Sequence, residues 1–298
     1  MPPSLQIQTV LYKPSPGSID RFLSSVSRAA DLAKTSTSVG NVSLVIGDCS
    51  PLRVLRAAHT ESLEKTLRQA GIDHLRYEFF DENLGSAAGH NLLLQAGDTD
   101  LVLILNPDVV ASPHLIQELT LRLDDHKIGL VEARQLPIEH PKSYDLATGE
   151  TSWASTACAL IPRHVIKVVG EFDAHSFFLY CDDVDYSWRI RLAGYKIIFH
   201  PPARVFHDKR LDTNGHIEVG SAEEYYAAEA ALMMTHKWSR PDLLDTFLHR
   251  LAANGSSLQR QAAQTFLKRR ALGDLPEPLD QAHQVGEFHG DNWAIHRW

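Results

Sequence analysis

The chain has 298 residues, of which 44% are hydrophobic and 22% charged, a composition typical of a protein that buries a substantial core in one large domain or two small ones. Its formal net charge of -8 argues against broad nucleic-acid binding, because neutralising phosphates requires a basic surface. No apolar run approaches the roughly 18 residues that a membrane helix needs and no signal sequence begins the chain, so we expect a cytoplasmic location.

The first part of the chain alternates strand-like and helix-like segments. Leu5 to Leu11 alternates apolar and polar residues and predicts a strand, and Ile19 to Ala33 has helical spacing. Val42 to Ile46 is a compact apolar strand, and Leu52 to Ala70 reads as another amphipathic helix. This alternation predicts an α/β fold, in which ligands lie at the carboxyl ends of the strands.

Carboxylates follow two of the predicted strands. Asp48 ends the strand Val42 to Ile46 in a polar turn, where contact with a ligand and capping of the next segment are equally good explanations. The apolar run Leu101 to Leu105 predicts a central strand buried on both faces, and Asn106 and Asp108 follow it. A carboxylate at the end of such a strand is placed to bind a hard cation.

A stretch of small residues, NLGSAAGHN, lies between these two strands, after a short predicted strand at Tyr77 to Phe80. Its glycines would let the backbone approach a ligand closely, while Asn83, His90 and Asn91 supply polar groups near a helix start. The stretch is neither a Walker loop nor a dinucleotide-binding pattern. Close packing of a helix on the sheet explains it equally well.

The middle of the chain continues the alternation. We predict a helix over Pro113 to Leu123, strands over Ile128 to Val131 and Ser155 to Ile161, a helix over Arg163 to Val169, and a polar, turn-rich segment over Pro137 to Trp153. After the acidic cluster described next, Tyr195 to Phe199 predicts a strand that Pro201 and Pro202 break, and a further strand, Ala203 to Phe206, leads to His207.

The stretch FFLYCDDVDYSWR, Phe177 to Arg189, holds three carboxylates within four residues: Asp182, Asp183 and Asp185. Like charges this close repel, so they are usually offset by a cation, by a helix N-terminus or by a functional need for an unusual base. The spacing of the apolar residues that follow predicts that a helix begins inside the cluster. On these residues alone, an acidic helix cap and a catalytic base have about even odds.

The last part of the chain is helical in pattern. Glu223 to Trp238 predicts a helix, and amphipathic pieces follow from Arg240 to the basic cluster Lys268 to Arg270. This region can pack on the rest of the chain, touch a membrane or form a homodimer, and packing is the commonest of these outcomes. We therefore divide the chain into an α/β domain over 1–239, with halves of about 1–110 and 111–239, and a helical and irregular C-terminal extension over 240–298.

Taken in order, the motifs NLGSAAGHN, LILNPDVV, GEFD and FFLYCDDVDYSWRIRLAGYKIIFHPPARVFH resemble the family 2 inverting glycosyltransferases with the GT-A fold. The likeness runs from about Leu5 to about Trp238 and is greatest to bacterial rhamnosyl- and galactofuranosyltransferases. It implies a Rossmann-like mixed sheet flanked by helices, with a helical C-terminal extension. Three features differ from the family pattern: the turn DCS in place of D-N-S, Asp182 in place of glutamate, and a helix Glu223 to Trp238 without the arginine-asparagine pair of the rhamnosyl branch.

The resemblance also implies a role for each motif residue. Asp183 takes the position of the catalytic base, and Asp182, Asp185 and Arg189 support the acceptor or the helix. The nucleotide-binding residues would be Thr9, Leu11, Asp48, Asn83, Gly89, Asn91 and Asn106. Asp108 corresponds to the residue that ligates Mg2+ or Mn2+, and His207 completes the metal or diphosphate site.

These roles predict transfer of a sugar, such as rhamnose, from a dTDP- or UDP-sugar to a hydroxyl of a glycan or lipid-linked glycan in bacterial surface polysaccharide assembly. One carboxylate would remove the acceptor proton and a cation would offset the charge on the departing diphosphate. Two alternatives are a non-catalytic GT-A-like module that binds nucleotide or glycan, and a sugar-nucleotidyltransferase. The second fits less well, because KPSPGS after the first strand is a poor match to a glycine- and basic-rich phosphate loop.

Overall fold

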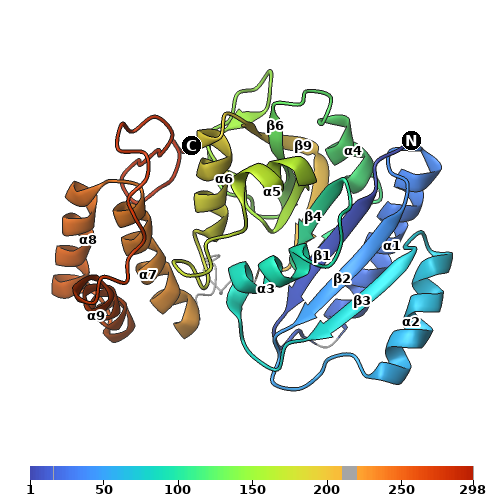
Figure 1. Cartoon of the computed structure of the whole chain (residues 1–298), viewed down its shortest axis with the longest axis horizontal. Helices are drawn as coiled ribbons and strands as arrows, with labels where there is room; N and C mark the ends of the chain where they lie inside the picture. The colour runs from blue at the N-terminus through green and yellow to red at the C-terminus, as the bar shows by residue number, and fades with distance from the viewer. Residues whose placement is uncertain (16, 210–219, 298) are drawn as a thin grey trace.

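The computed structural model describes residues 1–15, 17–209 and 220–297. In these residues a sheet of nine strands has the order β3-β2-β1-β4-β8-β6-β9-β5, with β7 paired to β9 (Figure 1). The strands are β1 (Leu5–Leu11), β2 (Val42–Asp48), β3 (His74–Phe79), β4 (Leu101–Leu105), β5 (Val109–Ala111), β6 (Ile128–Leu136), β7 (Glu150–Thr151), β8 (Cys158–Pro162) and β9 (Lys196–His207). The helices are α1 (Ser18–Thr35), α2 (Ala57–Gln69), α3 (Gly85–Leu94), α4 (Leu115–Leu121), α5 (Arg163–Val169), α6 (Asp182–Leu192), α7 (Ser221–Lys237), α8 (Pro241–Asn254) and α9 (Ser257–Ala271).

The strand directions bring the carboxyl ends of six strands to one edge of the sheet. Strands β1 to β4 are parallel to one another, while β8 is antiparallel to both β4 and β6. Strand β6 therefore runs with β4, and β9 runs parallel to β6. As a result β1, β2, β3, β4, β6 and β9 all end at the same edge, which is where an open α/β sheet binds its ligands.

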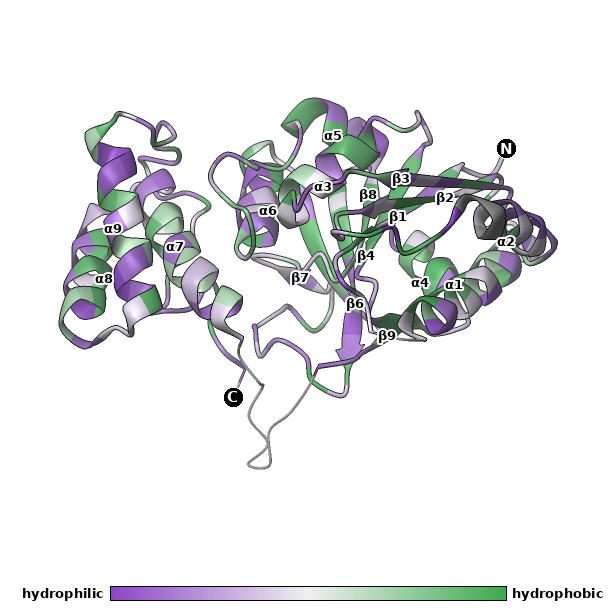
Figure 2. Cartoon of the chain, turned by 90° about the horizontal axis from the view of Figure 1, so that it is seen from below, coloured by the Kyte–Doolittle hydropathy of each residue, from purple (hydrophilic) through white to green (hydrophobic). Residues whose placement is uncertain are grey.

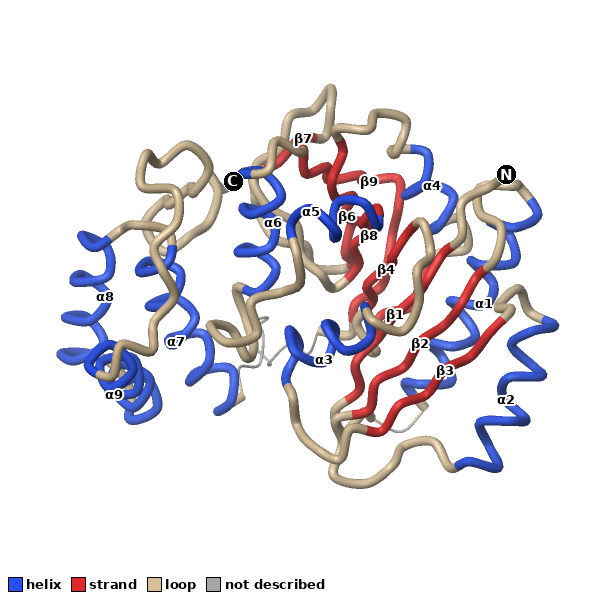
Figure 3. The backbone as a smooth tube through the Cα atoms, viewed as in Figure 1, coloured by secondary structure: helices blue, strands red, loops and turns tan. Residues whose placement is uncertain are grey.

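Helices cover both faces of this sheet (Figure 3). On one face, apolar residues of α1 and α4 pack on alternate residues of β1, such as Leu5 and Ile7. On the other face, α3, α5 and α6 pack on Val102 and Ile104 of β4 and on their neighbours. Because β4 is buried on both faces, its run of five apolar residues is continuous rather than alternating.

The three C-terminal helices form a bundle with its own hydrophobic cluster, which also takes in residues of α6. Helix α7 packs on α8 and α9, and Trp188 of α6 meets Trp238 edge-on with ring centroids 5.1 Å apart. Figure 2 shows the bundle beside α6, with apolar and polar residues interspersed along each helix. The predicted division after residue 239 therefore falls inside this helical unit, and how the chain divides into domains stays a prediction.

The end of the chain returns from the bundle to the segment between β6 and β7. Lys142 forms a β-bridge with His296, and the main-chain N–H of Arg297 donates to the carbonyl of Pro141 at 2.7 Å. The hydroxyl of Ser152 donates to the carbonyl of Trp293 at 3.2 Å. The tail, residues 293–297, thus fastens a segment that lies beside the candidate site.

The predicted elements differ from the structure in three ways. The prolines at 201 and 202 do not break β9, because they lie where its pairing with β6 jumps from His200 to Arg204, so their missing N–H groups cost no ladder bond. Helix α2 begins at Ala57 rather than at Leu52, since Asp48 holds Val54 N–H in the preceding turn. The short strands β5 and β7 were not predicted, because three and two residues carry too little pattern.

Candidate active site

The acidic cluster opens α6 at a strained turn. Tyr180 and Cys181 both have left-handed backbone conformations, with φ of 67° and 56°, a pairing that non-glycine residues rarely adopt. Cys181 is the N-cap, so Asp182 and Asp183 occupy the first turn at the positive end of the helix. Backbone strain of this kind persists where the surrounding structure enforces it, and it is concentrated at functional sites.

Asp183 has the properties of a base that works near neutral pH. Its Oδ1 accepts the main-chain N–H of Val184 at 2.8 Å, yet burial and the neighbouring charge of Asp182 raise its pKa to about 7. Asp182 is 5% exposed, burial also raises its pKa, and its Oδ2 has no hydrogen-bond partner among the described residues. A general base is most effective when its pKa lies close to the working pH, and Asp183 meets that condition.

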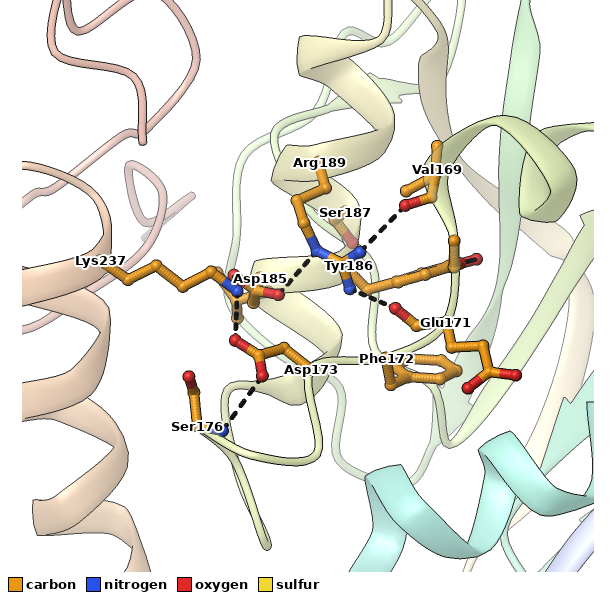
Figure 4. A network of polar contacts seen from close by, with 12 residues as sticks. Val169, Glu171, Phe172, Asp173, Ser176, Asp185, Tyr186, Ser187, Arg189 and Lys237 are labelled. Atoms are coloured by element: carbon orange, nitrogen blue, oxygen red, sulfur yellow. Dashed lines mark hydrogen bonds and ion pairs between the residues drawn. The ribbon is translucent and has the colours of Figure 1, made fainter. Parts of the chain in front are cut away.

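Asp185 has a different environment, although it lies only two residues further on. Its carboxylate is fully buried and accepts from Arg189 Nε at 2.9 Å, from Lys237 Nζ at 2.8 Å and from Trp238 Nε1 at 3.1 Å. Lys237 also pairs with Asp173 at 2.6 Å, and Arg189 donates to two main-chain carbonyls at and after the end of α5 (Figure 4). Asp185 and Arg189 therefore hold α6, the GEFD segment and α7 together.

Asp108 and His207 meet at the sheet edge, as their positions after β4 and at the end of β9 require. Strand β5 pairs with the end of β9, and His207 Nε2 lies 3.3 Å from Asp108 Oδ2. The other ring nitrogen of His207, Nδ1, lies 2.7 Å from Gln135 Oε1 of β6, a contact that fixes the ring. The carboxylate of Asp108 is about half exposed, at 46%, and so is open to a ligand.

The side chains of Asp108 and His207 suit a divalent cation whose other ligands are oxygens of a diphosphate. Asp108 supplies a carboxylate oxygen and His207 an imidazole nitrogen, both of which Mn2+ accepts. Across the described residues, no group of three or more His, Cys, Asp or Glu side chains is arranged to hold a metal ion. A two-residue set is what a Mg2+- or Mn2+-dependent site uses when substrate phosphates complete the coordination.

The carboxylate of Asp48 forms hydrogen bonds with neighbouring parts of the protein. Its carboxylate accepts the main-chain N–H groups of Ser50 at 2.9 Å and of Val54 at 2.8 Å, together with the hydroxyl of Tyr77. Burial and this contact with Asp48 raise the pKa of Tyr77 to about 12. The carboxylate thus shapes the turn after β2, and contact with a nucleotide base stays a prediction.

The other residues expected beside the nucleotide are placed as follows. Thr9 and Leu11 are fully buried in β1, and Thr9 Oγ1 lacks a hydrogen-bond partner within the described residues. Asn106 follows β4 and donates its main-chain N–H to Ala157 at 3.0 Å. Asn83 is exposed just before α3, and its Oδ1 accepts the N–H of Gly85 at 3.4 Å. That these four residues contact a nucleotide stays a prediction.

Within α3, Gly89 and Asn91 each have a structural partner. A Cβ atom on Gly89 would lie 2.9 Å from Val10 Cγ1, so the glycine lets α3 pack directly on β1. Asn91 forms two hydrogen bonds with the main chain of Phe172, at 2.8 and 2.9 Å, and so ties α3 to the GEFD segment. The close-packing explanation of the small-residue stretch therefore holds for these two positions.

The structure adds charged residues that the motifs did not indicate. Glu132 of β6 and Lys142 form an ion pair in which both side chains are buried, and Lys142 Nζ lies 4.0 Å from the centre of the Trp153 ring. The charges of Lys142 and Glu132 both act on the pKa of Asp183, in opposite directions. The charge of Lys209 interacts electrostatically with the carboxylates of Asp108, Glu132 and Asp183 and with the ammonium group of Lys142.

The sequence contains one indication of the Glu132–Lys142 ion pair. Glu132 is a charged residue inside the apolar strand IGLVEA, and a carboxylate in such a strand is rarely buried without a partner. Lys142 is in a polar, turn-rich segment and carries no comparable signal. Its burial depends on the returning tail, residues 293–297, which sequence spacing does not reveal.

This arrangement defines a protein of the GT-A class: a mixed sheet with helices on both faces and acidic groups gathered at its carboxyl edge. Solved structures with the same fold include the Pyrobaculum calidifontis mannosyltransferase PcManGT in complex with GDP-Man and Mn2+, with a TM-score of 0.54, 16% identity, and coverage of 92% of this chain and 81% of that one. GalNAc-T7 with UDP, GalNAc and Mn2+ has a TM-score of 0.61, 12% identity, and coverage of 95% and 57%. Staphylococcus aureus TarS has a TM-score of 0.57, 13% identity, and coverage of 92% and 49%. The predicted GT-A fold is confirmed.

The curated relatives of the chain are glycosyltransferases of Mycobacterium tuberculosis. A pre-mycofactocin glycosyltransferase is 29% identical over 168 residues, which cover 49% of this chain and 34% of the relative. An N-acetylglucosaminyl-diphospho-decaprenol L-rhamnosyltransferase is 29% identical over 119 residues, which cover 40% and 38%. The chain thus spans just over a third of the length of these relatives, and no protein-family model matches it.

Proposed function

We propose that this chain is an inverting, metal-dependent glycosyltransferase. The observation that carries the proposal is the presence of two acidic groups in different environments, both of which interact electrostatically with Lys209. Asp183 has its pKa raised to about 7, while Asp108 is exposed beside His207. Two carboxylates held in such different environments divide into a base and a cation ligand.

The residues of the site have different roles in the proposed reaction. Asp183 takes the proton from an acceptor hydroxyl as that oxygen attacks the anomeric carbon of the donor, and a single displacement with one such base inverts the configuration. A divalent cation on Asp108 and His207 would offset the charge that develops on the departing diphosphate. The positive charge of Lys209 interacts with both Asp108 and Asp183, and burial together with the charge of Asp182 keeps the pKa of Asp183 high.

The proposed donor is a nucleotide sugar, with dTDP-rhamnose first to be tested and UDP-sugars next. A rhamnosyltransferase among the matched proteins supports the first choice, and solved neighbours bound to GDP-Man and to UDP support the wider class. The proposed acceptor is a hydroxyl of a glycan or of a lipid-linked glycan in bacterial surface polysaccharide assembly.

A cytoplasmic location, contact with the inner face of the membrane and a homodimer belong to the same proposal. Of the helices in the described ranges, none is long and apolar enough to span a membrane.

A donor panel tests this function. The purified chain is incubated with dTDP-rhamnose, UDP-sugars and GDP-mannose, with Mn2+ or Mg2+, and with mono- and disaccharide glycosides as acceptors. We expect transfer from one donor, dependence on the metal, and a product whose anomeric proton coupling shows inversion. Retention of configuration would contradict the mechanism, and calorimetric binding of a nucleotide without turnover of any donor would favour a non-catalytic binding module.

A further inference from the structure

A group of aromatic residues lies where the segment before α6 meets other parts of the chain. Phe178 and Tyr180 precede α6, Tyr225 and Tyr226 are near the start of α7, and Tyr12 follows β1. We refer to these five residues as the aromatic rim. Figure 1 shows the segment before α6 close to both α3 and the start of α7. Contacts of Phe178 with Gly85 and with the Tyr226 ring confirm that these elements touch.

Three rings of the aromatic rim, those of Phe178, Tyr225 and Tyr226, are fixed relative to one another. Phe178 stacks on Tyr226 with ring centroids 4.6 Å apart and an interplanar angle of 26°, and Tyr225 meets Tyr226 edge-on at 5.0 Å. The hydroxyl of Tyr225 donates to Thr265 Oγ1 of α9 at 3.1 Å. Burial raises the pKa of Tyr226, and the nearby Glu229 and Tyr12 add to this effect. The C-terminal bundle therefore holds one side of the aromatic rim in place.

Core packing does not account for the central pair. Within the described part of the chain, Phe178 and Tyr226 belong to none of the three hydrophobic clusters, although both rings are large. Both side chains keep partial contact with solvent, and Tyr12 is 47% exposed. Stacked aromatic rings that are open to solvent and fixed by their neighbours are suited to binding another flat or apolar surface.

The aromatic rim is rigidly connected to the candidate base. The main-chain N–H of Ser86 donates to the Phe178 carbonyl at 3.1 Å, and a Cβ atom on Gly85 would lie 2.3 Å from that same oxygen. The chain then passes through the left-handed residues Tyr180 and Cys181 directly into α6. A ligand on the Phe178–Tyr226 stack is thereby positioned relative to the first turn of α6, which contains Asp183.

We propose that the aromatic rim is the acceptor subsite and that the Phe178–Tyr226 stack binds a sugar ring of the glycan next to Asp183. The C–H face of a pyranose packs on aromatic rings, while its hydroxyls stay free for polar partners and for the base. This subsite rests on the proposed function, because it presupposes a glycan acceptor. The stack itself is built on α7 and on the segment before α6, whereas the predicted base pocket lies at the ends of β1 and β2, next to Tyr12, so the donor KM is measured together with the acceptor KM.

Kinetics of Tyr226 variants test the subsite, with the donor and acceptor that the wild-type chain uses in the donor panel. We expect Tyr226→Ala to raise the acceptor KM by about tenfold, the loss of one aromatic contact, while the donor KM and the slow hydrolysis of the donor stay unchanged. Tyr226→Phe keeps the ring and should behave like wild type. Leu272→Ala, which truncates a 71% exposed side chain just beyond α9, is the control for general effects of the bundle.

Two outcomes would overturn the subsite. One is a Tyr226→Ala variant that melts like wild type and keeps its acceptor KM within about twofold. The other is a rise in donor KM in place of acceptor KM, which would assign the stack to the nucleotide. If the wild-type chain turns over no donor, the catalytic proposal fails by itself. NMR saturation transfer from the protein to the same glycosides then tests the subsite separately, and equal transfer in wild type and Tyr226→Ala would refute it.

Discussion

A substitution of Lys237 tests how α6 is held in place. Its ammonium group lies 2.6 Å from Asp173 and 2.8 Å from Asp185, and its side chain is only 6% exposed. Lys237→Met would leave these two carboxylates with one fewer cation in a buried site, and removing one partner of a buried pair costs about 3–5 kcal/mol. Arg189 and Trp238 still contact Asp185, so we expect the lower end of that range, about 3 kcal/mol.

Urea unfolding of the wild type and of Lys237→Met at pH 7 measures this loss. Lys167→Met is the matched control, because Lys167 pairs with Asp98 in an exposed bridge that should contribute less than about 1 kcal/mol. The pKa of Asp173 is lowered from its ordinary value of 3.8, since the contacts with Lys237 outweigh the effect of burial. Its contribution is therefore present above pH 4 and lost as the pH falls below its folded pKa, so the difference between the variants should shrink in acid. A loss below about 1 kcal/mol at pH 7 would refute the role given to Lys237.

Four further predictions concern the base, a cation ligand and the packing of α3. Because Asp183 must be ionised to act as a base, kcat should rise with pH through about 7, and a profile that is flat between pH 5 and 9 would contradict its assignment. The same raised pKa means that Asp183 stabilises the fold least once it is ionised, so Asp183→Asn should gain stability relative to wild type as the pH increases from 5 to 8, by about 2–3 kcal/mol in thermal or urea unfolding. Asp108→Asn should raise the Mn2+ concentration needed for half-maximal transfer by about tenfold or more, with a melting temperature like that of wild type, and an unchanged metal requirement would exclude Asp108 as the ligand. Gly89→Ala should destabilise the fold by about 1–3 kcal/mol through contact with Val10, and an equally stable variant would show that α3 does not need the glycine for packing.

Much of the fold follows from local patterns. The apolar runs of β1, β2 and β4 and the turns after them predicted which residues lie at the carboxyl edge, and the structure brings Asp108 and His207 together there. The short strands and the register jump in β9 depend on pairing with distant strands. Such pairing has no local periodicity, so the predicted break at the prolines was wrong.

The candidate site was predictable only in part, for the same reason. The helix start inside the acidic cluster and the inequality of Asp183 and Asp185 were predicted from spacing and from the family resemblance. The partners that make them unequal come from far along the chain: Trp238 is 53 residues from Asp185, and Lys142 is buried by the returning tail. Burial, and hence the raised pKa of Asp183, is a property of the assembled structure.

The most direct test of the account is the transfer activity of Asp183→Asn beside that of Asp145→Asn, a carboxylate in an exposed turn that accepts hydrogen bonds from Ala147 and Thr148 of the same turn. With the donor and metal that the wild-type chain uses, we expect Asp183→Asn to lower kcat by at least about a hundredfold, the typical contribution of a general base, while the donor still binds. Asp145→Asn should keep wild-type kcat. Full transfer activity in a folded Asp183→Asn variant would contradict the central claim that this one carboxylate removes the acceptor proton.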